Sequence, residues 1–455
     1  MRILIERKGG DVQVTGELMR SKGQLPALTN ARLLSLSMGY LGLQITFGIE
    51  SASLSRLYQS FGAEVDDLAL LWLAGPVAGL VVQPLVGRWS DFTWTRWGRR
   101  RPWIMGSGMI AVGALVGIAY APSLAWAIAM VWLLELAMNA LNAPYRALVG
   151  DTLPLHQQGR GFAMQTVFIG LGAFLGAMTP KLLSLAGVAN ISTLAATPES
   201  IRIAFLLAAA CLAVSVGGTV LSIREHGRED YARFGIAIAQ RPRDRAPLAA
   251  RALSTLVMLA PFRRIAAMQF FAWAALYLFW VYATPIVAMG TFGAANVQDP
   301  QYGAGADWVG VMFATYNGVA GLFAFLLPRV FDRYGVSVVH AAALMVGGAG
   351  FVGVAIAGSP GTLIVCSACI GIAYASLISS PFVLASALVA RTEAGTAIGL
   401  MNIFIVAPQL VMGFAAGAVI GWLSPGSPEI ALLGAGMFCV IAAIICGGHP
   451  RIATA

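Results

Sequence analysis

Long apolar segments alternate with short polar ones along almost the whole chain. A helix needs about 20 residues to cross roughly 30 Å of hydrocarbon, and apolar windows of this length recur throughout the sequence. Barrel strands would be about ten residues long and would alternate in polarity, so the continuous windows favour helices. We therefore expect an all-α membrane protein with twelve spanning helices, at 31–57, 68–88, 102–121, 124–150, 161–188, 201–223, 265–291, 307–329, 336–358, 361–390, 395–423 and 429–448.

The composition agrees with this pattern. Hydrophobic residues make up 58% of the 455 residues and charged residues only 11%. A water-soluble protein has no surface that accommodates so many apolar side chains. The bilayer is therefore expected to be the solvent of this chain.

The basic residues lie in every second polar segment. The formal net charge is +9, which on a soluble domain can indicate a nucleic-acid partner. Here the arginines and lysines gather in 1–32, 88–101 and 224–264, whereas the opposite side holds only Arg56, Lys181 and Arg202. The positive-inside rule then predicts a multi-pass protein of the plasma membrane, or bacterial inner membrane, with both termini in the cytoplasm and no nucleic-acid partner.

A polar stretch at 224–264 divides the spans into two sets of six. The two sets are weakly similar, because a displacement of the chain places Pro144 on Pro381 and Met164-Gln165 on Met401-Asn402. Repeated halves around a central site are typical of alternating-access carriers. The predicted domains are an N-terminal tail (1–30), two pseudo-symmetric six-helix bundles with a linker between them (31–223, 224–264 and 265–448), and a C-terminal tail (449–455).

The fourth span carries four polar residues on one helical face. Glu135, Asn139, Asn142 and Arg146 follow one another at intervals of four, three and four residues, which places them within about 60° of each other on a helix. Ionisable groups at membrane depth are costly and tend to be functional, so Glu135 is expected to face a cavity. For the two asparagines, hydrogen bonding between helices is an equally good interpretation.

The loop after the second span has a recognisable pattern, Gly87-Arg88-Trp89-Ser90-Asp91 followed by Arg96-Trp97-Gly98-Arg99-Arg100-Arg101-Pro102. It resembles the signature of the major facilitator superfamily. Its triple arginine and proline resemble the sucrose transporters, a branch of the glycoside-pentoside-hexuronide cation symporters. Further tracts similar to that branch occur in both halves: Trp72-Leu73-Ala74-Gly75-Pro76, Val82-Gln83-Pro84, Pro144-Tyr145-Arg146-Ala147-Leu148 with Asp151, Phe270-Phe271-Ala272-Trp273, and Asn402 with Val406-Ala407-Pro408-Gln409.

This resemblance implies the major facilitator fold and proton-coupled import of a glucoside-type sugar by alternating access. One departure concerns the end of span seven, where the plant proteins have an acidic stretch and this chain has Trp280-Val281-Tyr282-Ala283-Thr284. The substrate therefore stays open between sucrose, maltose and a similar disaccharide. A sodium-coupled sugar symporter and a proton-coupled exporter of another small molecule are the alternatives on the same fold.

The resemblance also assigns candidate roles to residues. Glu135 falls where the plant sucrose transporters carry the span-four aspartate that takes and releases the coupling proton, and Glu50 and Asp151 are the other candidates for that role. Sugars offer hydroxyls and weakly apolar ring faces, so amides, carboxylates and aromatic rings are expected at the site, although each aromatic side chain can equally pack between helices. The candidate substrate-binding residues are Gln44, Glu50, Asn139, Asn142, Arg146, Gln165, Trp273, Tyr316, Asn317, Asn402 and Gln409.

Charged residues near the span ends are candidates for gating. Charge-assisted bonds from Asp91 and the loop arginines to neighbouring helix ends can hold one side of a carrier shut. The same arginines can instead serve only as topology anchors. The candidate gating residues are Asp91, Arg96, Arg99, Arg100, Asp332 and Arg333.

Other chemistry finds little support in the sequence. The five cysteines all fall in apolar windows, and the Cys366-Ser367-Ala368-Cys369 spacing has neither a second pair nor nearby histidines. We expect no disulfide, no metal and no cofactor, and without a clustered nucleophile and base we expect no enzyme. The expected partners are a small-molecule sugar, a coupling proton and the lipid bilayer, and the chain is expected to function as a monomer.

Overall fold

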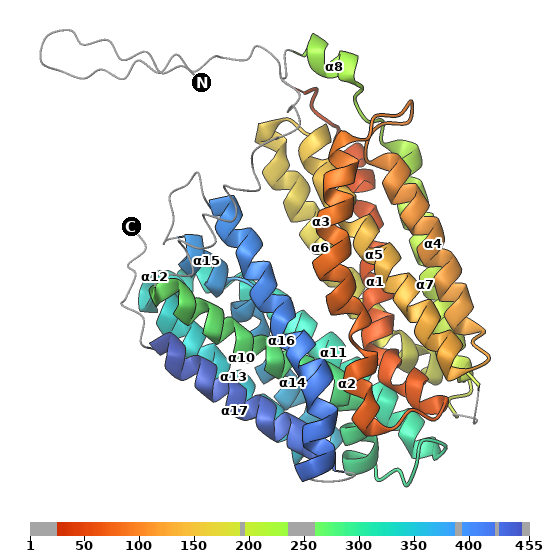
Figure 1. The fold of residues 1–455 in the computed structure, drawn as a ribbon, viewed down its shortest axis with the longest axis vertical. Helices are drawn as coiled ribbons and strands as arrows, with labels where there is room; N and C mark the ends of the chain where they lie inside the picture. Colours follow the sequence, from red (N-terminus) through yellow and green to blue (C-terminus); the bar gives the residue numbers. More distant parts are fainter. Residues whose placement is uncertain (1–24, 192–195, 235–259, 387–393, 424–426, 448–455) are drawn as a thin grey trace, which may run out of the picture.

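The structure is a computed structural model that describes residues 25–191, 196–234, 260–386, 394–423 and 427–447. Within these ranges the regular secondary structure is helical, and the only β-type pairing is an isolated bridge between Thr95 and Gly98. The helices form two bundles that touch at one end and diverge toward the other (Figure 1). The all-helical membrane fold expected from the sequence is therefore confirmed.

The first half of the molecule contains seven helices and a 3-10 turn. The second expected span is broken after Leu71, so that a short helix precedes a longer one. The fifth span begins earlier than expected, at Leu155. The elements are α1 (Asn30–Ser60), η1 (Val65–Asp67), α2 (Leu68–Leu71), α3 (Ala74–Phe92), α4 (Arg101–Ala119), α5 (Leu124–Thr152), α6 (Leu155–Leu185) and α7 (Glu199–Ser222).

The second half follows the small helix α8 (Arg228–Arg233). Its eighth and tenth expected spans are each divided, and the axis bends by 59° between α11 and α12. The elements are α10 (Ala260–Pro285), η2 (Ile286–Thr291), α11 (Pro300–Ala324), α12 (Leu327–Tyr334), α13 (Val336–Ala355), α14 (Pro360–Leu377), α15 (Ser380–Ser386), α16 (Ala394–Leu423) and α17 (Glu429–Gly447).

Ten helices of the described ranges are long and apolar enough to cross a membrane, and the bent pair α11 and α12 makes eleven. The helix α1 completes the twelve expected spans. Its 31 residues extend about 46 Å, enough to cross the bilayer. Because it lies against α6 and α7 and is largely buried between them, it can carry more polar residues than a lipid-facing helix.

Small residues bring α1 and α6 into close contact. A Cβ atom added at Gly48 would lie 2.9 Å from the Cα atom of Gly176, and one added at Gly176 would lie 2.4 Å from the carbonyl oxygen of Ile45. Only glycine permits such an approach of two helix backbones. This contact fixes the position of α1, which carries Gln44 and Glu50 to the centre of the molecule.

Capping residues fix where several helices begin. Ser123 accepts a hydrogen bond from the backbone N–H of Trp126 at the start of α5, and Asp299 accepts one from Gln301 at the start of α11. The N–H groups of Gln301 and Ala295 both donate to the Asp299 carboxylate, and these bonds lower the pKa of that group. The starts of α5 and α11 determine the depth of the polar residues farther along each helix.

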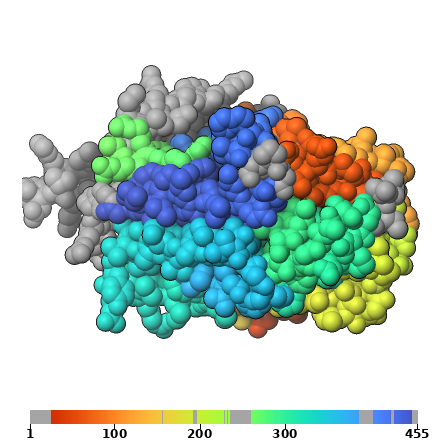
Figure 2. Space-filling model, turned by 90° about the horizontal axis from the view of Figure 1, so that it is seen from below, coloured from red at the N-terminus to blue at the C-terminus, as the bar shows by residue number. Residues whose placement is uncertain are grey.

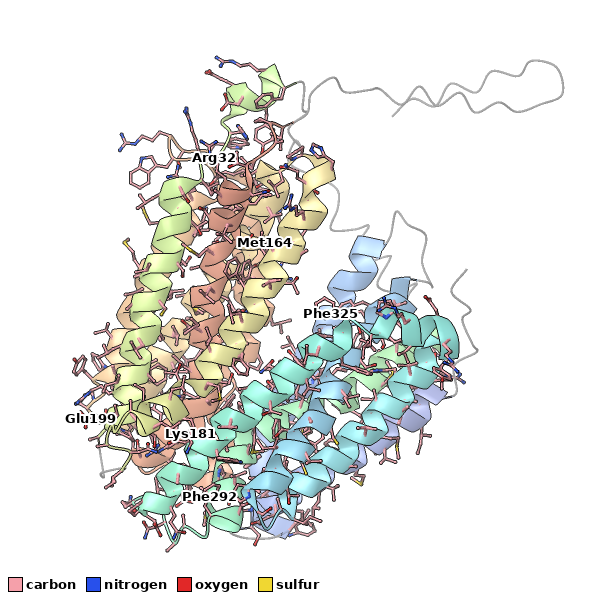
Figure 3. The ribbon with its side chains drawn as sticks, turned by 180° about the vertical axis from the view of Figure 1, so that it is seen from behind. Arg32, Met164, Lys181, Glu199, Phe292 and Phe325 are labelled. Carbon is pink, nitrogen blue, oxygen red and sulfur yellow. The ribbon has the colours of Figure 1, made fainter. Side chains whose placement is uncertain are left out.

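The two ends of the molecule differ, and we name them the Arg56 end and the Arg100 end after residues described below. At the Arg56 end the atoms of the two halves meet directly (Figure 2). Figure 3 places Lys181 and Phe292 near this end, and Arg32, Met164 and Phe325 toward the other, where the ribbons diverge. The side chain of Lys181 crosses to the second half, with its Nζ 5.7 Å from the centre of the Trp308 ring.

Candidate functional site

A cavity of about 360 Å³ lies between the two halves. Residues of α1, α3, α5 and α6 line it from the first half, and residues of α10, α11, α14 and α16 from the second. Its polar lining residues are Gln44, Glu50, Ser51, Gln83, Glu135, Asn139, Asn142, Asn317 and Gln409. Its aromatic lining residues are Phe47, Trp72, Tyr277, Trp280, Phe313, Tyr316 and Tyr374.

Two carboxyl groups face each other in the wall of this cavity. Glu50 comes from α1 and Glu135 from α5, and the two side chains line the same cavity as neighbours that interact electrostatically. Both are buried, with exposed fractions of 3% and 9%. Within the described residues, neither oxygen of Glu50 accepts a bond from a protein donor. Two carboxylates that are close together away from water repel each other unless at least one of them carries a proton, so the pair favours holding a proton.

Amide side chains extend from Glu135 along the first half of the cavity. Asn139 Nδ2 donates to Glu135 Oε2 over 3.0 Å, and Gln83 Nε2 donates to Asn139 Oδ1 over 2.6 Å. Gly75 of α3 lies so close that an added Cβ would be 2.9 Å from Glu135 Oε1. The orientation of Glu135 is therefore set by α3 as well as by its own helix.

The polar stripe of α5 divides between the cavity and a neighbouring cluster. Glu135, Asn139 and Asn142 line the cavity, whereas Arg146 does not. Tyr40 donates to Asn142 Oδ1 over 3.1 Å, and the Tyr40 hydroxyl also faces the Arg146 guanidinium. Arg146 therefore lies behind the cavity wall. It contacts Tyr40, which in turn bonds to the lining residue Asn142.

The second half contributes an aromatic wall. Trp280 Nε1 donates to the Tyr316 hydroxyl over 3.1 Å, and the Tyr316 ring packs edge-on against Tyr374 with centroids 5.4 Å apart. Asn317 and Gln409 donate to backbone carbonyl groups of their own helices at 2.8 and 2.9 Å. Their carbonyl oxygens are left as acceptors for a ligand in the cavity.

Two further candidate residues from the sequence, Gln165 and Trp273, do not line the cavity. Gln165 is buried in α6, and its Nε2 has no partner among the described residues. Trp273 donates to Gln269 over 3.1 Å and packs against Trp280 with centroids 6.3 Å apart. The side chain of Asn402 lies outside the described part of the chain.

Sequence reasoning did not select Gln83, Trp72 or Tyr374 as site residues, although all three line the cavity. Gln83 is a polar residue in the middle of an apolar segment, which is the same signal that pointed to Asn139. The aromatic residues gave no comparable signal, because a single aromatic ring in a membrane helix packs in many environments.

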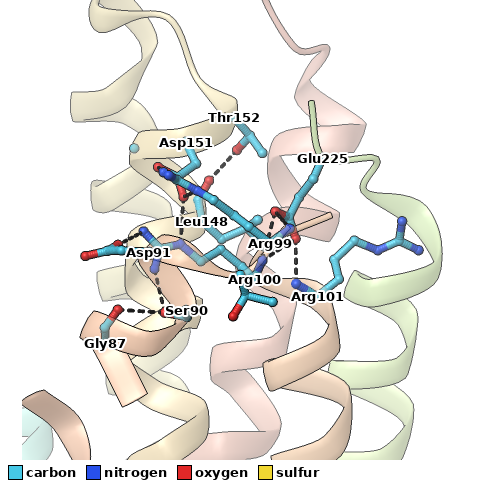
Figure 4. Close-up of polar contacts among 12 residues, drawn as sticks. Gly87, Ser90, Asp91, Arg99, Arg100, Arg101, Leu148, Asp151, Thr152 and Glu225 are labelled. Carbon is cyan, nitrogen blue, oxygen red and sulfur yellow. Dashed lines mark hydrogen bonds and ion pairs between the residues drawn. The ribbon is translucent and has the colours of Figure 1, made fainter. Parts of the chain in front are cut away.

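The Arg100 end carries a charge network that lies entirely in the first half (Figure 4). Arg100 is 4% exposed; it donates to Asp91 over 2.5 Å, to Asp151 over 2.8 Å and to the Ser90 hydroxyl over 2.6 Å. Arg99 forms a two-point ion pair with Asp151. The network thus joins the ends of α3 and α5 to the start of α4, and the partners found for it among the described residues all belong to the first half.

Glu225, which the sequence analysis did not select, completes this network. Its carboxylate accepts hydrogen bonds from the backbone N–H groups of Arg99, Arg100 and Arg101, at 2.8, 2.9 and 2.5 Å. These groups lie at the start of α4, where a negative charge is favourable. Glu225 therefore anchors the segment after α7 to the loop that holds the arginines.

Electrostatics favour the charged form of the Arg99 guanidinium. Burial alone would lower the pKa of the Arg99 guanidinium, but the hydrogen bond and charge of Asp151 outweigh burial and raise that pKa. The pair is partly exposed, with 17% and 16% of the two side chains accessible.

The other candidate gating residues are outside the network. Arg96 lies over the ring of its neighbour Trp97, 5.8 Å from the centroid, and Arg333 lies over Tyr334 at 5.2 Å. Asp332 and Arg333 are exposed, and neither forms an ion pair within the described ranges.

The Arg56 end holds the two halves together through a buried polar clasp, defined by Arg56, Asn190 and Asp307. Arg56 of α1 donates to Asn190 Oδ1 over 2.6 Å and to its backbone oxygen over 2.8 Å. Asn190 Nδ2 in turn donates to Asp307 of α11 over 2.7 Å. Arg56 is 2% exposed and Asp307 is 0% exposed, so the clasp joins opposite charges away from water.

Backbone contacts support the clasp around the same end. Ser55 donates to the carbonyl oxygen of Val281 over 2.8 Å, and Tyr277 donates to that of Ala69 over 2.6 Å. A Cβ added at Gly417 of α16 would lie 1.9 Å from the backbone oxygen of Asp66. The halves are therefore closed against each other here, and the cavity is separated from this side.

Comparison with known proteins adds independent information. The family model of the Major Facilitator Superfamily matches residues 36–300. The chain is 25% identical to the sucrose transport protein SUT5 of Oryza sativa subsp. japonica, over 90% of this chain and 88% of that protein. It is 27% identical to the general alpha-glucoside permease of Schizosaccharomyces pombe, over 34% of this chain and 31% of the permease.

Solved structures resemble the fold closely despite low identity. The nucleoside transporter NupG superposes with a TM-score of 0.69 at 13% identity, covering 93% of this chain and 100% of that one. The peptide transporter POT in complex with sulfate gives a TM-score of 0.67 at 12% identity, with coverages of 93% and 96%. At these identities the likeness concerns the fold alone.

Proposed function

The chain belongs to the Major Facilitator Superfamily, and from this premise we propose that it is a proton-coupled symporter that imports a glucoside-type sugar by alternating access. It is a transporter rather than an enzyme. The proposed substrates are sucrose, maltose or a similar disaccharide, since the relatives along the chain are named as sucrose and alpha-glucoside transporters.

The observation that carries the proposal is the carboxyl pair of Glu50 and Glu135 in the cavity between the halves. When both carboxyl groups are deprotonated, two negative charges lie near each other in a poorly solvated site, and their repulsion is strong there. A change of surroundings is needed to stabilise that state. Loss of the proton is thereby tied to movement of the halves, which is what coupling requires.

The rest of the cavity fits a sugar. Its volume of about 360 Å³ is within the range of small-molecule sites. The first half supplies carboxyl and amide groups for hydroxyls, and the second half supplies rings such as Trp280 on which an apolar sugar face can stack. A substrate in this cavity contacts both halves at once, so its binding can favour one arrangement of the halves over another.

We further propose that the domains are 31–223 and 265–448, joined by the linker 224–264, and that they move as two bodies. With the Arg100 end in the cytoplasm, as the positive-inside rule requires, the structure is the state that is closed outside and open inside. The clasp at Arg56 then closes the outer side. The Arg100 network holds the inner ends of α3, α4 and α5 together in the first domain. The second domain approaches this end when the inner side closes.

The deciding experiment is uptake by the purified protein in proteoliposomes. Labelled mono- and disaccharides are offered with an imposed pH gradient, with a sodium gradient, and with neither. We expect a disaccharide to accumulate only with the pH gradient, acidic outside. Accumulation driven by sodium instead would establish the sodium-coupled alternative. Proton movement that does not depend on sugar and accompanies the loss of another solute would indicate an exporter.

Orientation can be tested by labelling single cysteines. Glu64 and Arg160 are both exposed, at the Arg56 and Arg100 ends respectively. An impermeant thiol reagent added to whole cells is expected to label Glu64→Cys at once and Arg160→Cys only after the membrane is permeabilised. Immediate labelling of the Arg160 variant would reverse the proposed topology. The five native cysteines are first replaced by serine or alanine.

Two tryptophans separate sugar stacking from helix packing. Trp280→Ala removes a ring that lines the cavity and is expected to weaken sugar binding by roughly tenfold, as about 1–2 kcal/mol of ring contact is lost. Trp273→Ala removes a ring that packs behind it, and we expect a smaller loss. Binding is measured by calorimetry on the purified protein. An equal loss in both variants would assign the effect to packing of α10.

A further inference from the structure

A second cavity, of about 490 Å³, lies at the Arg100 end, apart from the transport cavity. The loop before α4, the start of α4 and the segment after α7 form it. Three arginines line it, Arg96, Arg101 and Arg224, together with Trp97 and Leu221. None of these residues lines the transport cavity.

The three arginines have no carboxylate partner within the described ranges. Arg101 Nη1 makes only a long bond of 3.4 Å to the backbone oxygen of Trp97, and its Nε is buried without a partner. In Figure 4 the Arg101 side chain extends away from Asp151 and toward the neighbouring helix. Three guanidinium groups that line one cavity without a carboxylate partner suit the binding of an anion.

The acidic residues of the same cavity are committed elsewhere. Glu225 accepts three backbone bonds at the start of α4, as described above. Asp230 accepts a hydrogen bond from the backbone N–H of Gly227 over 2.9 Å. Within the described ranges neither carboxylate forms an ion pair with the guanidinium groups of the cavity, so these groups are available to an external anion.

The surroundings of the cavity fit a lipid better than a soluble anion. Leu221 in its rim is 84% exposed and Trp97 is 47% exposed. Beyond the rim, α4 and α7 lie against each other, and Met109 and Val214 on these helices are 66% and 70% exposed. Exposed apolar side chains on spanning helices face acyl chains, and tryptophan with arginine marks the headgroup level.

We propose that this cavity binds the phosphate group of an anionic phospholipid through Arg96, Arg101 and Arg224, with the acyl chains lying along α4 and α7. The guanidinium groups supply charge and paired N–H donors to the phosphate. Leu221 and Trp97 contact the glycerol and the first methylene groups. The site does not depend on the identity of the transported solute.

The test is lipid binding to the full-length protein in detergent, measured by native mass spectrometry. Phosphatidylglycerol and phosphatidylcholine with identical acyl chains are titrated separately. The wild type is expected to prefer phosphatidylglycerol, and each arginine to contribute roughly fivefold. R96Q/R101Q/R224Q should lose the preference. The single variant R224Q removes a side chain that forms no ion pair within the described ranges, and it should lose part of the preference.

A matched control removes the same charge elsewhere at the same end. Arg88, Arg160 and Arg329 are exposed there, and R88Q/R160Q/R329Q should keep the preference. An equal loss in this control would show a diffuse charge effect and overturn the proposal, as would retention of the preference in both R224Q and the triple variant. Glycerol phosphate is added as a soluble competitor. Displacement of the lipid at millimolar concentrations would assign the cavity to a soluble anion instead.

Discussion

Glu135→Gln is expected to abolish accumulation of sugar against its gradient while exchange of internal for external sugar continues. Glutamine keeps the size of the side chain and can still bond to Asn139, which contacts Glu135 at 3.0 Å. It cannot release a proton, so the site that it forms with Glu50 never reaches the state with two negative charges. Carrier movement without net proton flux gives exchange but no accumulation.

Both modes are measured in the same proteoliposomes, with and without an imposed pH gradient. The matched control is Glu135→Asp, which retains an ionisable group one methylene shorter and should keep part of the accumulation. A purely structural role for Glu135 predicts that the glutamine variant loses exchange and accumulation together. If the variant still concentrates sugar, the proton is carried elsewhere, and Glu50 or Asp151 becomes the leading candidate.

Asp307→Ala is expected to open the Arg56 end. The substitution removes the buried carboxylate that Asn190 links to Arg56 through hydrogen bonds. Removing one partner of a buried ion pair costs about 3–5 kcal/mol, and here that cost falls on the closed state, in which the two groups are brought together. A penalty of this size shifts a two-state equilibrium by two or more orders of magnitude.

The shift can be measured as a distance between spin labels at Glu64 and Ala295, which are exposed in the two halves at this end. We expect the short distance of the closed state to be replaced by a longer one. Glu199→Ala removes an exposed carboxylate at the same end, paired with Arg202 at 3.5 Å, and should change nothing, since exposed pairs contribute little.

A second variant opens the clasp by steric means. A Cβ added at Gly303 of α11 would lie 2.2 Å from the backbone oxygen of Asn190, so Gly303→Ala should shift the distance in the same direction. If neither variant changes the distance distribution, the clasp does not control the outer closure, and the backbone contacts around Ser55 and Tyr277 hold the halves together instead.

The sequence by itself determined that the chain is a multi-pass helical membrane protein, because hydrocarbon thickness and backbone hydrogen bonding allow only long apolar helices. It also placed Glu135, Asn139 and Asn142 on one helical face, since the helical period is a local property. The breaks after Leu71 and Ala324 were not apparent, because apolar composition continues through them.

Only the tertiary structure decided which side chains meet. Glu225 contacts the backbone of Arg99 from 126 positions away, and no local pattern marks a loop glutamate as the acceptor for a distant helix start. Likewise Glu50 faces Glu135 because glycine contacts fix α1 against α6. Hydrophobicity and helical period are properties of neighbouring residues. The Glu50 and Glu135 pair, the clasp and the Arg100 network depend instead on how whole helices pack.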